Sequence, residues 1–187
     1  MTHRLITSRI TGFCIVALLF AVLAVPATAQ TAGKTWEIGF NAGSGDLGGD
    51  DELDLERRFD GRVGYFLNDH VQLELQLLRA DAILDAELLV GLGNVVVNFR
   101  PESRVVPYVL AGGGIARIED FQIFGDEPDE EDDGTVFQVG VGTRIFLGDS
   151  DVIALRLEVS NLWTDTDVFG STQDTSLTAG MSWSFGR

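Results

Sequence analysis

Hydrophobic and polar residues alternate with a period of two along most of the chain after residue 33. Trp36, Ile38 and Phe40, for example, are separated by Glu37 and Gly39. This period is typical of a β-strand with two different faces. The runs approach the roughly nine to eleven residues that a tilted strand needs to cross a hydrocarbon layer. The five clearest runs are 34–42, 71–77, 137–145, 153–160 and 177–185.

Three further segments predict strands with a weaker pattern: 59–65, 89–100 and 106–116. The last two are rich in Val and Gly on both faces, so the pattern leaves their register open. Gly112, Gly113 and Gly114 would weaken an ordinary strand and mark a bend or tight packing. In a narrow barrel they would leave room for large side chains opposite. The total is eight strands.

The segments between these strands have two lengths, which alternate along the chain. Short connections are expected at 67–70, 101–104 and 148–151, and long ones at 44–56, 79–87, 117–134 and 161–173. Outer-membrane barrels show this asymmetry, with short periplasmic turns and long extracellular loops. The chain is therefore predicted to be all-β, an eight-stranded antiparallel up-and-down transmembrane β-barrel with both termini on the short-turn side.

The polar faces of the strands carry a balanced set of charges. A mixture of three acids and three bases suits a filled interior in which charges pair, and eight strands leave just enough room for side chains there. The alternative is a soluble sandwich or barrel whose charged face meets water. The predicted interior charge network consists of Glu37, Arg62, Glu74, Arg144, Arg156 and Glu158.

Aromatic residues gather at the strand ends that lie next to short turns or termini. In a membrane barrel, such residues form a girdle at the level of the lipid headgroups. The placement favours a membrane barrel over a soluble one. The predicted periplasmic girdle consists of Trp36, Tyr65, Phe99, Tyr108 and Phe185.

The first 29 residues have the layout of a secretory signal peptide. Arg4 and Arg9 precede an apolar run from Phe13 to Val25, and Ala27-Thr28-Ala29 forms a cleavage site of the A-x-A type. The run is too short for the ~20 residues of a spanning helix. We expect cleavage after Ala29, which removes Cys14, the only cysteine, and leaves the barrel domain at 30–187.

Net charge restricts the possible partners. Two of the 13 basic residues precede residue 30, so 11 basic and 29 acidic residues remain after it, a net charge of −18. Nucleic acid is an unsuitable partner for such a surface. No apolar run of spanning-helix length follows the signal segment. A membrane location therefore requires a closed barrel, which satisfies every backbone polar group internally.

The chain resembles the small outer-membrane β-barrel superfamily, the OmpA/OmpX-like and porin-like barrel proteins. Three segments and the final alternating strand carry this resemblance: 64–71 (GYFLNDHV), 107–114 (PYVLAGGG) and 139–144 (VGVGTR). The resemblance implies an outer-membrane location with periplasmic termini. It also implies three partners: outer-membrane lipid, lipopolysaccharide, and the outer-membrane assembly machinery during biogenesis. Members commonly end on an aromatic residue, whereas this chain continues from Phe185 to Arg187.

Residues suited to catalysis are scarce. Enzymes of the superfamily resemble one another in using histidine near the outer rim. Here His3 leaves with the signal peptide, and His70 falls in a short turn on the opposite side. Ser and Asp are common in the loops, but no base accompanies them. We expect no enzyme activity and no cofactor.

The third long loop is strongly acidic, with seven acids in the eight residues 126–133. One interpretation is binding of Ca²⁺ or Mg²⁺ at the cell surface, although the spacing matches no EF-hand. The other, which we favour, is a solvated loop that keeps the surface soluble. The candidate metal ligands are Asp126, Glu127, Asp129, Glu130, Glu131, Asp132 and Asp133.

Two functions fit these features of the sequence. The first is a monomeric structural or surface-interaction protein with displayed loops and a lumen plugged by paired charges. The alternative is a narrow porin-like channel for small solutes. A soluble periplasmic barrel is a third possibility, which cell fractionation would exclude.

Overall fold

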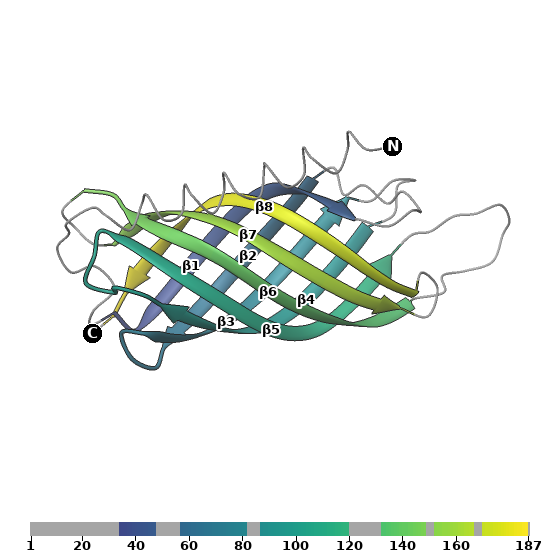
Figure 1. The fold of residues 1–187 in the computed structure, drawn as a ribbon, viewed down its shortest axis with the longest axis horizontal. Coiled ribbons are helices and arrows are strands. Elements are labelled where there is room, and N and C mark those ends of the chain that lie inside the picture. Colours follow the sequence, from purple (N-terminus) through teal and green to yellow (C-terminus); the bar gives the residue numbers. More distant parts are fainter. Residues whose placement is uncertain are drawn as a thin grey trace, which may run out of the picture.

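In the computed structural model the chain forms a closed barrel of eight strands in sequence order (Figure 1). The structure describes residues 34–47, 57–81, 87–119, 132–148, 152–166 and 170–186. No helix in these ranges is long and apolar enough to cross a membrane. The strands are β1 (Trp36–Leu47), β2 (Arg57–Phe66), β3 (Val71–Asp81), β4 (Glu87–Asn98), β5 (Val105–Glu119), β6 (Asp132–Phe146), β7 (Ile153–Thr166) and β8 (Gly170–Phe185).

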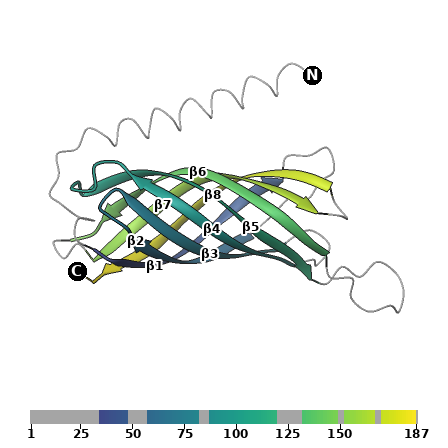
Figure 2. The same ribbon diagram turned by 90° about the horizontal axis from the view of Figure 1, so that it is seen from below.

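Every strand pairs antiparallel with its neighbours in the chain, and β1 pairs with β8 to close the cylinder. Trp36 lies opposite Tyr65 on one side and Phe185 on the other. The strands cross the barrel obliquely in both side views (Figures 1 and 2). The predicted eight-stranded antiparallel up-and-down barrel is confirmed. The predicted signal peptide lies outside the described residues.

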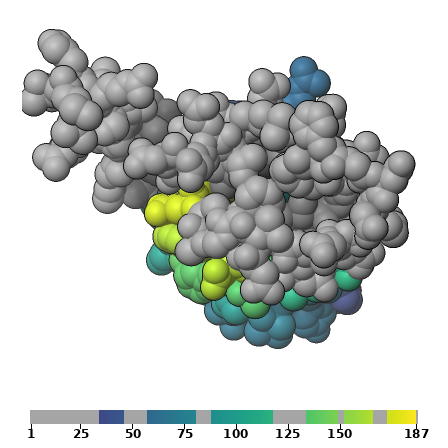
Figure 3. Space-filling view, turned by 90° about the vertical axis from the view of Figure 1, so that its right-hand side faces the viewer, coloured from purple at the N-terminus to yellow at the C-terminus, as the bar shows by residue number. Residues whose placement is uncertain are grey.

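The two ends of the barrel differ. One, the short-turn end, holds residues 34 and 186 and the connections 67–70, 99–104 and 147–152. The other end, the long-loop end, holds the remaining four connections. Most of their residues lie outside the described ranges: 48–56, 82–86, 120–131 and 167–169. Figure 3 views the molecule from the long-loop end, with atoms of the described strands in colour.

The connection expected at 161–173 is mostly strand, so that prediction was wrong. β7 continues to Thr166 and β8 starts at Gly170, and the two residues pair. Here polar residues such as Asn161 and Asp165 stand on the outward face. With polar residues on both faces, the alternation that marks a half-buried strand disappears from the sequence.

Burial alternates along each strand, and the apolar side chains point outward. Leu75 and Leu77 of β3 are 70% and 67% exposed, whereas Glu74 and Gln76 between them are buried. A soluble calyx has the opposite arrangement, with its apolar face inside. The outward apolar face and polar interior are those of a barrel that stands in lipid.

The register of β4 and β5, which the sequence left open, follows from barrel closure. Val96 of β4 lies opposite Leu110 of β5, and both side chains point inward. The inward-facing glycines of β5 were expected to leave room for large side chains opposite. Instead, the backbone of the neighbouring strand β4 lies close against them. A Cβ atom on Gly114 would overlap the carbonyl oxygen of Gly91 on β4.

Candidate functional site: a charge network across the lumen

The barrel interior, or lumen, contains all six charged residues that the alternation assigned to the polar face. Each sits at an inward position of its strand, and none is more than 3% exposed. They come from five strands, so barrel closure brings together residues that are far apart in sequence. The lumen charge network comprises Glu37 of β1, Arg62 of β2, Glu74 of β3, Arg144 of β6, and Arg156 and Glu158 of β7.

Arg156 is the centre of this network. Its Nη1 donates to Glu74 Oε2 at 2.6 Å and lies 3.3 Å from Glu37 Oε1. Its Nη2 donates to Glu158 Oε2 at 3.2 Å, and its Nε donates to Tyr108 Oη at 2.8 Å. One guanidinium thus joins three carboxylates and a phenol. Charge-assisted hydrogen bonds of this kind are stronger than those between neutral groups.

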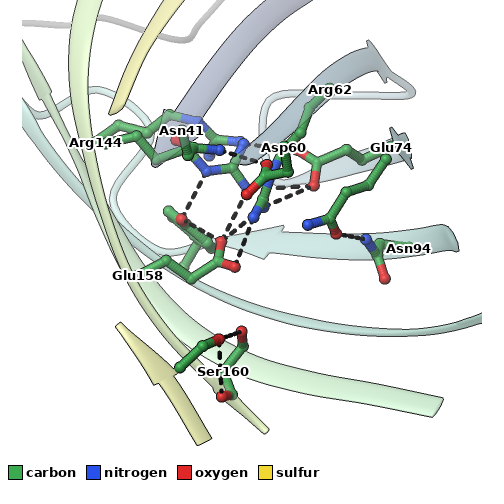
Figure 4. A network of polar contacts seen from close by, with 12 residues as sticks. Asn41, Asp60, Arg62, Glu74, Asn94, Arg144, Glu158 and Ser160 are labelled. Carbon is green, nitrogen blue, oxygen red and sulfur yellow. Dashed lines mark hydrogen bonds and ion pairs between the residues drawn. The ribbon is translucent and has the colours of Figure 1, made fainter. Parts of the chain in front are cut away.

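Arg62 of β2 forms the second junction, and Figure 4 shows it beside Asp60 and Glu74. Its two terminal nitrogens donate to the two Glu158 oxygens at 2.8 and 2.9 Å, a bidentate arrangement. Its Nη1 also reaches Glu74 Oε1 at 3.1 Å, and its Nε donates to Asp60. Asp60 was absent from the predicted network. It stands two residues from Arg62 on the same inward face, a spacing that could have identified it.

Arg144 extends the network toward the short-turn end. Its Nε lies 2.9 Å from Glu37 Oε2, and its terminal nitrogens donate to the amide oxygens of Asn98 and Gln72. Next to it, Val106, Phe146 and Ala154 form a buried apolar cluster. At this end the interior therefore holds apolar side chains beside the charged ones.

Tyr108 is buried at 1% exposure, so its predicted place in the aromatic girdle was wrong. Its hydroxyl donates to Glu158 Oε2 at 2.8 Å and accepts from Arg156. The guanidinium carbons of Arg144 and Arg156 lie 4.6 and 4.8 Å from the centre of its ring. The sequence could not show this, because residues on both faces of β5 are apolar.

The other four predicted girdle residues, Trp36, Tyr65, Phe99 and Phe185, have exposed side chains at the short-turn end. The rings of Trp36 and Tyr65 meet edge to face, with centroids 4.9 Å apart. Their role at a membrane interface stays a prediction. A second aromatic pair, Phe137 and Trp163, lies in the long-loop half with centroids 5.8 Å apart. Sequence reasoning missed Trp163, because it falls in the segment expected to be a loop.

We predict that Tyr108→Phe destabilises the folded barrel by about 1.5–3 kcal/mol, the usual range for a hydrogen bond to a charged group. The substitution removes the hydroxyl that Arg156 and Glu158 share, and the aromatic ring stays in place. Denaturant unfolding in micelles measures the effect. Tyr65→Phe is the matched control, because the Tyr65 side chain is exposed and the change is expected to cost less than about 0.5 kcal/mol. Equal stability of the two variants would contradict the role given to the Tyr108 hydroxyl.

The lumen is less polar in its long-loop half than the alternation in the sequence predicts. An apolar cluster lines the side formed by β3 to β7, because inward positions there carry aliphatic residues. The opposite side is polar: Arg58 donates to Ser176 at 2.6 Å, and Thr178 and Asp174 are buried nearby on β8. The apolar cluster consists of Leu78, Ala80, Val90, Leu92, Ala116, Val136 and Leu162.

Several buried polar atoms in the lumen make no hydrogen bond to protein groups. They include the side-chain amide of Gln138 and the hydroxyls of Thr178 and Ser182. Buried groups of this kind usually bind water. The described lumen therefore combines a tightly bonded charge cluster with polar positions that suit water molecules.

The described residues offer little for catalysis or metal binding. His70 lies exposed in the turn 67–70, where its backbone N–H donates to Asn68. No group of three or more His, Cys, Asp or Glu in the described ranges could hold a metal ion. The candidate metal loop 126–133 falls outside these ranges except for Asp132 and Asp133, which begin β6. It stays a prediction.

Comparison with known proteins relates the chain to barrels of the outer membrane. The family model of the outer membrane protein beta-barrel domain matches residues 15–185. Among solved structures, neisserial surface protein A is 16% identical with a TM-score of 0.63, over 80% of this chain and 97% of that one. OprG of Pseudomonas aeruginosa is 13% identical with a TM-score of 0.54, over 87% and 100%. No curated protein matches the sequence.

Proposed function

The chain belongs to the outer membrane protein β-barrel domain family, which implies a location in the outer membrane, and we propose that it has a structural or surface-interaction role there. In this proposal the barrel is a rigid support, and the connections of the long-loop end are displayed at the cell surface. Its partners are outer-membrane lipid and lipopolysaccharide, and the assembly machinery during biogenesis. The protein acts as a monomer.

The observation that carries this proposal is the lumen charge network. A pore needs a continuous open path, whereas Arg62 and Arg156 each join two or more carboxylates contributed by opposite walls. Breaking one buried pair by removing a partner costs about 3–5 kcal/mol. Opening the lumen would require several such contacts to separate together. This favours a plugged barrel whose function lies in its loops and outer surface.

The position of the two termini at the short-turn end supports a periplasmic location for both of them. The short-turn end carries the termini and the exposed side chains of Trp36, Tyr65, Phe99 and Phe185, and short turns of bacterial barrels face the periplasm. The long connections then face outward. The neisserial relative is described as a surface protein, which agrees with loop display.

Cell fractionation with protease treatment tests location and orientation together. We expect the protein in the outer-membrane fraction, with unheated samples migrating differently from boiled ones on a gel. Protease added to intact cells should cut within 120–131 and leave the turn 67–70 uncut. Recovery in the osmotic-shock fluid would overturn the membrane location. Cleavage at 67–70 without cleavage at 120–131 would reverse the orientation.

A narrow channel for small solutes is the second candidate. The buried polar atoms without protein partners favour it, because water at Thr178 and Ser182 would extend along the β8 side of the lumen. Single-channel recording in planar bilayers separates the two functions. A plugged barrel gives no steady conductance, whereas a channel gives a reproducible unit conductance that changes when Arg62 is replaced by glutamine.

A further inference from the structure

The apolar belt on the outer wall of the barrel has an even lower edge. At the short-turn end, each strand carries an apolar residue at the outward position where the strand begins or ends. Height on the wall is counted from these residues: Trp36, Tyr65, Val71, Phe99, Val105, Ile145, Ile153 and Phe185. Each further residue adds about 2.5 Å of height, from a rise of about 3.3 Å and a strand tilt of about 40°. A belt of the usual height, about 25 Å, therefore ends about ten residues above this edge.

The belt reaches this height over β4 to β6. Eight residues above the lower edge, the outward positions of these strands hold Gly91, Gly113 and Phe137, and the Phe137 side chain is 51% exposed. Ten residues above the edge, Leu89 of β4 and Ile115 of β5 still present apolar side chains, 41% and 69% exposed. Acyl chains of the usual length can therefore cover this part of the wall.

The upper edge is lower where β7, β8 and β1 meet. Ser44 of β1 and Asn161 of β7 stand at outward positions eight residues above the lower edge, and Thr175 of β8 stands ten above it. These three residues form the polar notch. Asn161 lies opposite Thr175, whose hydroxyl donates to Asn161 Oδ1 at 2.6 Å. Leu177, which is 59% exposed, stands beside them and opposite Ser44.

Short polar side chains at this height need polar surroundings. In a belt of the usual height, Ser44 and Asn161 would lie about 5 Å inside the hydrocarbon, where polar groups without water are costly. The hydrogen bond to Thr175 uses only part of the capacity of Asn161, because a side-chain amide has two N–H donors and one acceptor oxygen. Arg57 and Arg79 stand at the same height on β2 and β3, but long side chains of this type can extend to the headgroups. Serine and asparagine are too short to do so.

We propose that lipid headgroups and water of the outer leaflet enter the polar notch, so that the membrane is thinner over β7, β8 and β1 than over β4 to β6. The proposal rests on the proposed function, because it places the long-loop end in the outer leaflet. A bilayer adapts to a short apolar stretch by thinning. None of the three side chains of the notch is charged, so the match is one of polarity and not of headgroup charge.

Two features of the wall support thinning over other adjustments. Tilting the whole barrel would raise the notch, but it would also lift Trp36 and Phe185 on the same side, away from the headgroups of the other leaflet. Trp163 stands two residues above Asn161 on β7, next to Phe137. Tryptophan is the residue common at headgroup level, which agrees with headgroups directly above the notch.

Spin labels at two matched heights test the proposal. Leu177→Cys places a label beside the notch, and Gly91→Cys places one on the tall side, where an added Cβ would lie 3.9 Å from the nearest atom. Both positions are eight residues above the lower edge, and Cys14→Ser removes the only native cysteine. The full chain is folded into dioleoyl phosphatidylcholine vesicles, and collisions with oxygen and a nickel chelate give the depth of each label. We expect the label at position 177 to be about 5 Å shallower, the height of two residues. Equal depths would overturn the proposal.

Filling the notch with apolar side chains gives a second measurement. In the chain labelled at position 177, Ser44→Val, Asn161→Val and Thr175→Val together are expected to lower the label to the depth found at position 91. Valine suits outward strand positions in lipid. Thr135→Val is the matched control, because Thr135 is an exposed outward threonine of β6 outside the notch, and it should leave the label at its original depth. An unchanged depth in the triple variant would contradict the role of the notch.

Two further outcomes have distinct meanings. If a second copy of the chain covered the notch, labels at position 177 would broaden each other's spectra, and dilution with unlabelled protein would remove the broadening; this result would overturn the proposal. The vesicle measurement does not depend on cellular location. A periplasmic protein whose label at 177 is shallow in vesicles would contradict the proposed function alone, whereas an outer-membrane protein with equal label depths would contradict only the thinning.

Discussion

Replacing Arg156 by methionine is expected to destabilise the folded barrel by about 3–5 kcal/mol, the cost of leaving buried charges without their partner. Arg156 contacts Glu37, Glu74 and Glu158, so its loss leaves three buried carboxylates with Arg62 and Arg144 as the remaining cations of the network. Methionine keeps much of the side-chain volume, which separates the charge effect from cavity formation. Urea unfolding in micelles, followed by tryptophan fluorescence, gives the free energy of unfolding.

Two comparisons make this prediction specific. Arg57→Met removes an arginine whose side chain is exposed on β2, and we expect a change below about 0.5 kcal/mol. The double variant Arg156→Met with Glu74→Met removes a carboxylate together with its cation. It should regain part of the lost stability, because an apolar pair avoids the desolvation of buried charge. A loss below about 1 kcal/mol in the single variant would contradict the central place of Arg156.

Gly114→Val is expected to prevent or strongly impair folding, with a loss of about 3 kcal/mol or more. A Cβ atom at Gly114 would overlap the carbonyl oxygen of Gly91, and one at Gly112 would overlap the carbonyl oxygen of Gly93. These obstacles are backbone atoms of the adjacent strand, which cannot turn away as a side chain could. The β4–β5 ladder would have to separate. The fraction of protein that migrates as the folded form on an unheated gel, and the denaturant midpoint, measure the effect.

Gly93→Val is the control for this prediction. Gly93 faces outward on β4, and the nearest atom to an added Cβ is the carbonyl oxygen of Gly113 at 3.9 Å. Valine also has a higher strand propensity than glycine. We expect normal folding and equal or higher stability. Similar behaviour of the two variants would mean that close backbone approach does not explain the glycines of β5.

The alternation in the sequence was sufficient to predict the fold. Strand number, antiparallel order and the placement of termini at the short-turn end follow from periods and connection lengths, which are local properties of the chain. The inward orientation of Glu37, Arg62 and Glu158 was also predictable, because a charged residue at an alternate position identifies its face. Asp60 could have been added by the same argument.

Tyr108 shows where the sequence pattern stops being informative. A period of two indicates which face is buried only when the two faces differ in polarity, and β5 is apolar on both. The inward position of Tyr108 follows from the register with β4 and β6, which barrel closure sets. The apolar cluster around Leu78 and Leu162 escaped prediction for a related reason, since an interior of this width must be filled whatever its polarity.

Neighbours along the chain suffice to predict which strands form and that the six charges of the lumen network point inward. Which of these charges meet depends on the tertiary structure. Arg144 and Glu37 are 107 positions apart, and their contact depends on the stagger between strands on opposite walls. An apolar groove on the outer wall, lined by Phe40, Gly61 and Leu77, likewise exists only because the register places that glycine between the two larger side chains. Contacts across a lumen or between strands are set by closure of the whole barrel, a property that no single segment contains.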